Sequence, residues 1–388
     1  MTDRHPSSKV PRAVPFHRPS LAEGELENVR QVLASGHLAR DGAFSRRCAE
    51  WLVRQTGAAH AMLTHSCTGA LELAAILSGV GPGDEVILPS FTFTSTANAF
   101  VLRGATPVFV DIRSDTLNLD ERLVEAAITS RTRVIVPVHY AGVACEMDAL
   151  LALAKGRGLF VVEDAAQGIL ASYKGRALGT LGDAGALSFH ETKNVVSGEG
   201  GALFVTDALK ARAAIVRDVG TNRGAFAAGE VDRYTWLDVG GSFGPGELIA
   251  ACLLAQLERA EALVASRLRL WQRYMTAFAD AEAREWLRRP VVPPGCVHNG
   301  HIFYVVLRDA LRRDALLARV RARGIGAAFH YVPLHSSPAG QRFGRTAGSL
   351  TVTDTASASL VRLPLYSDME DGLVDDVVTA VTEALGDL

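Results

Sequence analysis

Between residues 61 and 206 the chain repeats one pattern: a short apolar run rich in Val, Ile, Leu or Phe, a turn, and a longer stretch whose apolar residues recur with helical period. Short apolar runs that alternate with helical segments are typical of a mainly parallel sheet covered by helices. The pattern therefore predicts an α/β fold with one large, mainly parallel seven-stranded sheet. The predicted strands are residues 61–64, 86–89, 107–111, 133–139, 159–163, 186–190 and 202–205.

After residue 256 this alternation ends, and helical segments surround a single strand-like run. We therefore predict a large domain at 13–256 and a smaller C-terminal α+β domain at 257–388. The polar opening, residues 1–12, is expected to form a flexible tail. The elements predicted for the smaller domain are a long Arg- and Ala-rich helix at 257–281, a strand at 301–307, and helices at 309–323 and 375–385.

The composition is that of an ordinary globular protein with balanced charge. Of 388 residues, 48% are hydrophobic and 21% charged, and 40 Lys and Arg stand against 42 Asp and Glu, which disfavours disorder and a basic nucleic-acid-binding protein. The sequence has no run of about 18 apolar residues, so we expect no membrane span, and its polar opening predicts no signal peptide. The five cysteines lie far apart without zinc-type spacing, which predicts no metal site and a cytoplasmic location.

Only five of the 40 cationic residues are lysines, so chemistry that needs a reactive amine has few candidates. Most lysines are solvated surface groups, and four of these five fit that description. Lys193 differs because it follows the apolar run 186–190 by three residues and leads into a Gly-rich segment. It is therefore expected in a loop at the carboxyl end of a strand, where ligands bind in open α/β sheets.

Two adjacent carboxylates, Glu163 and Asp164, stand at the end of another predicted strand. A single carboxylate at such a place can cap a turn or pair with an arginine. Consecutive strand residues point to opposite faces of a sheet, so these two cannot act together as an acid/base pair. We infer that one of them faces a partner at the edge of the sheet.

Two further strand ends carry hydroxyl groups. Residues 65–70 place Ser, Thr and Gly at the start of an apolar helix, whose free N–H groups and positive dipole end suit a phosphate. A simple helix cap is the alternative reading. Residues 89–96 place aromatic rings among hydroxyl groups, and such a ring can cover a flat ligand or pack in the core.

All four features are expected at the same edge of the sheet. A phosphate cradle, a carboxylate, a stacking ring and a sheltered lysine are the parts that pyridoxal 5′-phosphate (PLP) requires. The lysine forms a Schiff base with the cofactor aldehyde, and the carboxylate keeps the pyridine nitrogen protonated so that the ring accepts electrons. The sequence therefore predicts a PLP enzyme.

Five stretches of the chain also have a familiar sequence: PSFTFTSTANAFVLRGA, RVIVPVHYAGVACEMDALLALAK, LFVVEDAAQG, YKGRALGTLGDAGALSFHETKN and FHYVPLHSSPAG. In these stretches the chain resembles the sugar aminotransferases of the DegT/DnrJ/EryC1/StrS family, and the likeness runs from about residue 14 to the C-terminus. The resemblance implies the fold type I of PLP-dependent transferases, which is that of aspartate aminotransferase.

The resemblance also implies which residues bind the cofactor ring. Lys193 would be the Schiff-base lysine and therefore the catalytic residue, and Asp164 would contact the pyridine nitrogen. Gln167 would contact the ring hydroxyl. Phe93 matches the position whose ring stacks on the pyridine, with Phe91 as the alternative.

Two other parts of the site follow from the same resemblance. Thr68, Gly69 and Ser188 would hold the phosphate, and His330 and Tyr331 would lie near the sugar nucleotide. The chain departs from the family at residues 242–245, where many members have an asparagine that reaches the partner subunit's phosphate. The loop after Lys193 is also one residue shorter than in near relatives.

The implied reaction is transfer of the amino group of L-glutamate to the C4 ketone of a nucleotide-linked sugar. The favoured substrate is dTDP-4-keto-6-deoxy-D-glucose, which would give a dTDP-4-amino-4,6-dideoxyhexose, and another keto-sugar nucleotide is the alternative. A lysine at position 193 argues against the dehydratases of this family, which have a histidine there. Relatives of this fold type share active sites between two subunits, so a homodimer is expected.

Two readings lie outside this class of enzyme. A nicotinamide-dependent nucleotide-sugar oxidoreductase would need a G-x-G-x-x-G motif after the first strand, and the sequence has none there. A non-catalytic regulator that only binds the cofactor is not separated from an enzyme by these motifs.

Overall fold

The computed structural model describes residues 13–21 and 23–388. The tail predicted at residues 1–12 lies outside these residues. The helices are α1 (Gly24–Ser35), α2 (Ala43–Thr56), α3 (Cys67–Leu77), α4 (Thr94–Val101), α5 (Glu121–Ala127), α6 (Met147–Arg157), α7 (Asp207–Arg217), α8 (Arg223–Ala227), α9 (Glu247–Glu258), α10 (Ala260–Ala277), α11 (Ala279–Ala283), α12 (Arg313–Ala322), α13 (Pro338–Phe343), α14 (Thr351–Ser359) and α15 (Asp371–Gly386).

One large sheet organises the first two thirds of the chain. Its order is β1-β9-β8-β5-β4-β2-β3-β13, and β9 alone runs antiparallel to its neighbours. All seven predicted strands are present, and an eighth, which we did not predict, comes from the C-terminal part and joins the edge. The strands are β1 (His60–Thr64), β2 (Glu85–Pro89), β3 (Thr106–Val110), β4 (Thr132–Ile135), β5 (Phe160–Asp164), β8 (Ala184–Ser188), β9 (Gly201–Val205) and β13 (Arg345–Thr346).

Helices cover both faces of this sheet, as the alternation of buried side chains along each strand shows. In β2, Ile87 packs in the apolar cluster formed with α2, α5, α6 and α9, whereas Val86 and Leu88 pack in the cluster formed with α3, α4 and α7. Successive strand residues point to opposite faces, so these continuous apolar runs are those of strands buried on both sides. The sheet is the middle layer of three.

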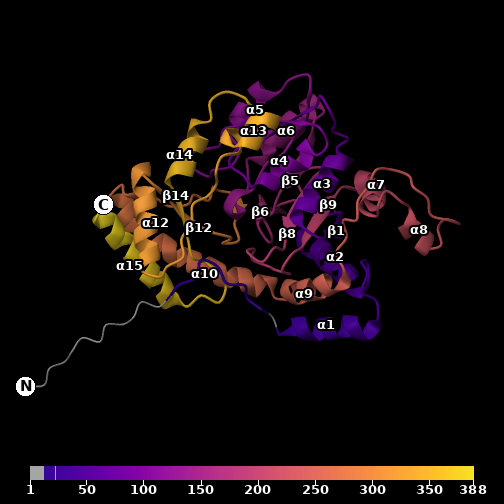
Figure 1. The fold of residues 1–388 in the computed structure, drawn as a ribbon, viewed down its shortest axis with the longest axis horizontal. Coiled ribbons are helices and arrows are strands. Elements are labelled where there is room, and N and C mark those ends of the chain that lie inside the picture. Colours follow the sequence, from indigo (N-terminus) through magenta and orange to yellow (C-terminus); the bar gives the residue numbers. More distant parts are fainter. Residues whose placement is uncertain (1–12, 22) are drawn as a thin grey trace, which may run out of the picture.

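A third apolar cluster lies in the C-terminal part, around an antiparallel sheet of β10 (Leu287–Arg288), β12 (Phe303–Leu307) and β14 (Leu360–Leu363). Helices α10, α12 and α15 pack around it, and Figure 1 shows them together, in orange and yellow, beside the large sheet. A third, short sheet joins β6 (Ser172–Tyr173), β7 (Arg176–Ala177) and β11 (Cys296–Val297). The architecture is therefore a large α/β sheet with smaller sheets attached.

The single long helix predicted at 257–281 is wrong. The chain there forms α9, α10 and α11, with breaks at Arg259 and Phe278. Helix α9 packs on α1 and α2, whereas α10 packs on α15. The domain boundary predicted between residues 256 and 257 falls in the last turn of α9 and stays a prediction.

No helix among the described residues is long and apolar enough to cross a membrane. The five cysteines form no disulfide.

Candidate active site

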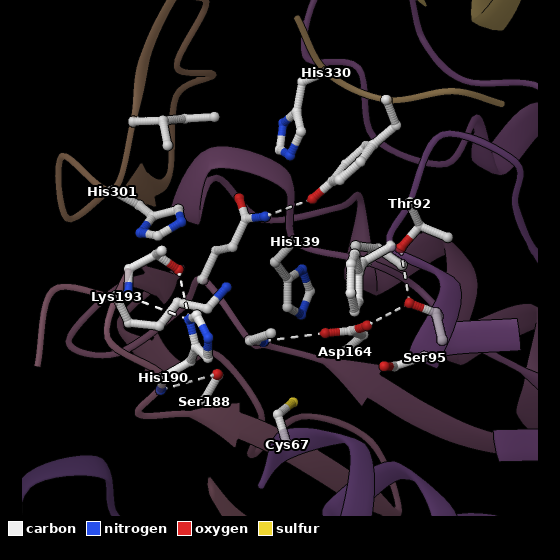
Figure 2. Close-up of a pocket in the computed structure, with 18 of the residues that line it drawn as sticks. Cys67, Thr92, Ser95, His139, Asp164, Ser188, His190, Lys193, His301 and His330 are labelled. Carbon is white, nitrogen blue, oxygen red and sulfur yellow. Dashed lines mark hydrogen bonds between the residues drawn. The ribbon is translucent and has the colours of Figure 1, made fainter. Parts of the chain in front are cut away.

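A cavity of about 310 Å³ opens where the parallel strands of the large sheet end. Its wall combines the ends of β5 and β8 and the starts of α3 and α4 with residues of the C-terminal part, among them His301, Tyr331 and Arg362. In Figure 2, His301 and His330 of the C-terminal part lie on the opposite side of the cavity from Asp164 and Ser188. The carboxyl ends of the strands are the edge at which the sequence predicted a site.

Lys193 projects into this cavity from the loop that follows β8. Its backbone N–H donates to the carbonyl oxygen of His190 (2.9 Å), and its amine has no hydrogen-bond partner among the residues that the structure describes. Burial lowers the pKa of the Lys193 amine, Cys67 and Asp164 act to raise it, and the positive charge of Arg362 lowers it further. A lysine whose pKa is lowered holds its neutral, nucleophilic form at lower pH than a surface lysine does.

The two carboxylates at the end of β5 face opposite sides of the sheet. Asp164 lines the cavity, and its carboxylate accepts hydrogen bonds from the Thr96 hydroxyl (2.7 Å) and the backbone N–H of Ala166 (3.1 Å). Glu163 is fully buried on the other side, where it accepts from His139 and from the N–H groups of a loop. Asp164 is therefore free to meet a ligand, and Glu163 holds the scaffold.

Hydroxyl groups gather at the start of α3. The Thr68 and Ser95 hydroxyls lie 2.7 Å apart, and both residues line the cavity with Ser188. The first turn of α3 adds N–H groups that have no acceptor within the helix. This end of the cavity has the donors and the dipole direction that suit a phosphate.

Gly69 is not among the residues that line the cavity, although its neighbour Thr68 is. Its N–H donates to the Ser66 hydroxyl (3.0 Å), which caps α3. A Cβ at this position would come within 2.9 Å of the His65 ring. Gly69 therefore takes part in the helix cap and packs closely against His65, and its expected contact with the phosphate stays a prediction.

The two aromatic candidates have different surroundings. Phe93 lines the cavity with 61% of its surface exposed. Phe91 is 1% exposed and packs edge-on against Tyr140 and Tyr331. Only Phe93 can cover a ligand ring, and Phe91 belongs to the core.

The remaining predicted residues meet on the C-terminal side of the cavity. The Gln167 side chain accepts from the N–H of Ala141 (2.7 Å) and donates to the Tyr331 hydroxyl (3.1 Å). The His330 ring lies 3.1 Å from the Tyr140 hydroxyl. Burial lowers the pKa of His330 and raises that of Tyr331, so both are neutral near pH 7.

Sequence reasoning missed several cavity residues from the C-terminal part. His301 begins the run predicted as a strand, and its Nδ1 lies 2.9 Å from the Asn194 side-chain oxygen. Because Asn194 directly follows Lys193, this contact ties the lysine loop to the segment before β12. Arg267 and Arg362 also line the cavity. Lys193 could be found from the sequence because the chain has only five lysines. It has 35 arginines, and no sequence feature sets Arg267 and Arg362 apart from the others.

The family comparison agrees with this geometry. The sequence model of the DegT/DnrJ/EryC1/StrS aminotransferase family matches residues 19–382. The chain belongs to this family. It is thus a PLP-dependent aminotransferase, of a family that acts on sugars, and its architecture is the α/β fold type I of these enzymes.

Individual relatives match nearly the whole chain. The spore coat polysaccharide biosynthesis protein SpsC of Bacillus subtilis (strain 168) is 36% identical over 379 residues, which are 95% of this chain and 96% of SpsC. The aminotransferase TlmJ from Streptoalloteichus hindustanus is 33% identical, with 97% and 99% of the chains covered and a TM-score of 0.88. The putative sugar aminotransferase Spr1654 from Streptococcus pneumoniae, in its PLP form, is 26% identical, with 97% and 99% covered and a TM-score of 0.88.

The cavity residues fit the cofactor of the DegT/DnrJ/EryC1/StrS aminotransferases. Four groups face one space: an amine that has no partner among the described residues, a carboxylate held by two donors, a cluster of hydroxyl groups at a helix start, and an exposed aromatic ring. No cluster of ligands for a metal ion occurs in the described part of the chain.

Proposed function

We propose that this enzyme transfers the amino group of L-glutamate to the C4 ketone of a nucleotide-linked sugar. The preferred acceptor is dTDP-4-keto-6-deoxy-D-glucose, and the product is a dTDP-4-amino-4,6-dideoxyhexose. The observation that carries the proposal is the unpartnered Lys193 amine, which shares its cavity with Asp164. The dehydratases of this family have a histidine in place of that lysine.

The choice of acceptor is supported by sequence. The five stretches that carry the family resemblance resemble those of the dTDP-4-amino-4,6-dideoxygalactose transaminases. Another keto-sugar nucleotide is the second candidate, since relatives with closely similar folds act in different pathways. The relative SpsC takes part in spore coat polysaccharide biosynthesis, which is consistent with a sugar substrate.

PLP supplies an aldehyde that combines with amines and a protonated ring that withdraws electrons from the reacting carbon. Asp164 would keep the ring nitrogen protonated, and Thr96 and the N–H of Ala166 hold its carboxylate in place. Thr68, Ser95, Ser188 and the start of α3 would hold the phosphate, and Phe93 would cover the ring.

Lys193 would act as the acid and base of the transfer. Its Nζ would take the proton from the α-carbon of glutamate in the first half of the transfer, and would deliver a proton to C4 of the sugar in the second half. This role needs an amine that loses and regains its proton near neutral pH, and the burial of Lys193 lowers its pKa toward that range. Gln167, His330 and Tyr331 would contact cofactor or sugar from the C-terminal side.

The test is incubation of the PLP-loaded enzyme with L-glutamate and dTDP-4-keto-6-deoxy-D-glucose. We expect 2-oxoglutarate and an amino sugar in equal amounts, and the NMR couplings of the sugar H4 give the configuration at C4. Glutamate alone should bleach the cofactor absorbance, which neither a nicotinamide enzyme nor a passive regulator would show. The absence of 2-oxoglutarate with every keto-sugar nucleotide supplied would refute the proposal.

A further inference from the structure

The imidazole ring of His301 is held in one orientation at the cavity wall. His301 is 4% exposed, and it lines the cavity together with Lys193 (Figure 2). Its Nδ1 lies 2.9 Å from the side-chain oxygen of Asn194, whose Nδ2 donates to the carbonyl oxygen of Asn299 (2.8 Å). The backbone N–H of His301 donates to the side-chain oxygen of Asn299 (3.0 Å). Two buried asparagines therefore fix the ring.

These contacts determine which ring nitrogen of His301 carries the proton. The amide nitrogen of Asn194 is used on Asn299, so the amide oxygen faces the ring, and an amide oxygen can only accept. His301 therefore donates through Nδ1. Burial, and after it the charge of nearby cations, lowers the pKa of His301, so the ring is neutral near pH 7. Its Nε2 then has a lone pair and no proton.

The Nε2 atom of His301 has no hydrogen-bond partner among the residues that the structure describes. The ring of His139, which also lines the cavity, uses both of its nitrogens, one on Glu163 and the other on the N–H of Cys145. A buried acceptor without a donor costs free energy until a ligand supplies one. His301 is therefore arranged to receive a donor from a bound molecule.

Donors are scarce among the groups that this cavity would bind. The cofactor phosphate, the carboxylates of glutamate, the diphosphate and the ketone oxygen are all acceptors, and the resemblance assigns the ring hydroxyl of the cofactor to Gln167. The only donor of glutamate is the amino group that reacts. The remaining donors belong to the nucleotide sugar, and among them are the hydroxyl groups of its hexose.

The hydroxyl group at C3 of the hexose is the one nearest to the reaction. C4 must come within reach of Lys193, and His301 is tied to Asn194, the next residue in the chain, at 2.9 Å. Of the two carbons bonded to C4, C3 carries a hydroxyl group, whereas C5 carries the ring oxygen and a methyl group.

We propose that His301 Nε2 accepts a hydrogen bond from the C3 hydroxyl of the 4-keto sugar and so selects acceptors that have this group. The inference rests on the proposed function and names the feature of the acceptor that the cavity recognises. Asn194 and Asn299 are positioning residues, since they act through the ring of His301. A site that pairs with a hydroxyl group discriminates against an analogue without it, because its own polar group is then left unpaired.

The test uses dTDP-4-keto-6-deoxy-D-glucose and its 3-deoxy analogue, dTDP-4-keto-3,6-dideoxy-D-glucose. Calorimetry measures the binding of each to the PLP-loaded enzyme, which cannot aminate them without glutamate. His301→Phe keeps a ring and removes Nε2. His298→Phe is the matched control, because His298 lies in the same segment, packs against Trp271 and is not among the residues that line the cavity. An unchanged cofactor spectrum in each variant shows that the fold is kept.

We expect wild type to bind the sugar with the C3 hydroxyl at least about tenfold more tightly than the 3-deoxy analogue. His301→Phe should bind the two within about twofold of each other, and His298→Phe should discriminate as wild type does. The glutamate concentration for half-bleaching should change less than about twofold in His301→Phe, since glutamate offers Nε2 no hydroxyl group.

Three results would overturn the inference: a wild type that does not discriminate between the sugars, an undiminished discrimination in His301→Phe, or a change confined to glutamate bleaching. The proposed function is tested separately by the formation of amino sugar. If discrimination depends on His301 but glutamate and the keto sugar give no amino sugar, the proposed function fails while the hydroxyl contact stands.

Discussion

At the scale of single residues, the site depends on one amine kept free of partners. Lys193 has no ion pair among the described residues, whereas Lys174 on the surface is paired with Asp148. The difference follows from position: Lys193 lies in a loop above the sheet edge, inside a cavity, and Lys174 lies in a turn facing solvent. Its surroundings leave Lys193 available for chemistry.

We predict that Lys193→Ala still binds PLP, because the hydroxyl groups, Asp164 and Phe93 remain. Turnover should fall by at least about 1,000-fold, since both proton transfers need the same base. Steady-state release of 2-oxoglutarate measures turnover, and equilibrium dialysis measures the cofactor. Lys174→Ala is the control and should keep wild-type activity. Comparable turnover in Lys193→Ala would exclude the role assigned to this lysine.

The lowered pKa of Lys193 gives a prediction about pH. An amine reacts only in its neutral form, so a lower pKa moves half-maximal labelling to lower pH. In the enzyme stripped of cofactor, formaldehyde with a borohydride should methylate Lys193 at lower pH than Lys174, whose pKa Asp148 raises. Mass spectrometry of the labelled peptides measures both sites. Added PLP should protect Lys193 alone; equal pH dependence of the two sites would contradict the lowered pKa.

The residues that sequence reasoning found share a local signal that the missed ones lack. Lys193 and Asp164 each follow a buried apolar run, so the end of a strand could be recognised and the cavity edge inferred. Arg362 lies inside a strand, where a charged residue between apolar ones normally faces solvent. Only the packing of the small sheet against the large one turns Arg362 toward the cavity.

At the scale of elements, the end of the cavity that would hold the phosphate depends on how closely β9 approaches α3. Strand β9 begins at Gly201, where a Cβ would come within 2.5 Å of the N atom of Cys67 and the carbonyl carbon of Ser66. Both contact atoms are backbone at the start of the helix, so they cannot move aside as a flexible side chain can. The Gly-rich segment after Lys193 thus allows the sheet and the helix N-terminus to meet.

We predict that Gly201→Ala weakens PLP binding by about tenfold or more, because the added methyl group pushes the start of α3 away from the other phosphate donors. Fluorescence titration of the stripped enzyme with PLP measures this affinity. Gly81→Ala is the control, since a Cβ there meets no atom within 4 Å. Equal PLP affinities of the two variants would show that the close contact between β9 and α3 does not support phosphate binding.

The sequence predicted strands of the large sheet better than the helices that join its parts. A buried strand is defined by its own apolar residues, so all seven were recognised. The breaks at Arg259 and Phe278 depend instead on which surface each helix packs against, and a continuous helical period hides them. Strand β13 has two residues and joins the sheet edge through tertiary contacts, so it left no pattern to read.

At the scale of the whole molecule, two of the segments that expose large apolar side chains are helix α1 and residues 219–239. Helix α1 exposes Leu26 and Leu33, and residues 219–239, which include α8, expose Trp236 (78%) among others. In Figure 1 the segment with α8 extends beyond the body of the sheet. Exposed apolar surfaces of this kind mark association with a partner. Together with the family resemblance, they support our proposal of a homodimer in which these segments meet the second subunit.

We predict that the combined variant Leu33→Glu/Trp236→Glu is monomeric in light scattering after gel filtration, whereas wild type is a dimer. Two buried carboxylates would have no partner at an apolar interface, which costs several kcal/mol of association free energy. The matched control is Leu311→Glu, because Leu311 is 91% exposed in the C-terminal part and lies on neither segment. The monomer should also bind PLP more weakly if the two subunits share their active sites, as the resemblance implies. Residues 242–245, the segment from which many family members reach the partner subunit's phosphate, closely follow residues 219–239. A variant that stays dimeric would place the association surface elsewhere. A monomeric wild type would contradict the proposed homodimer.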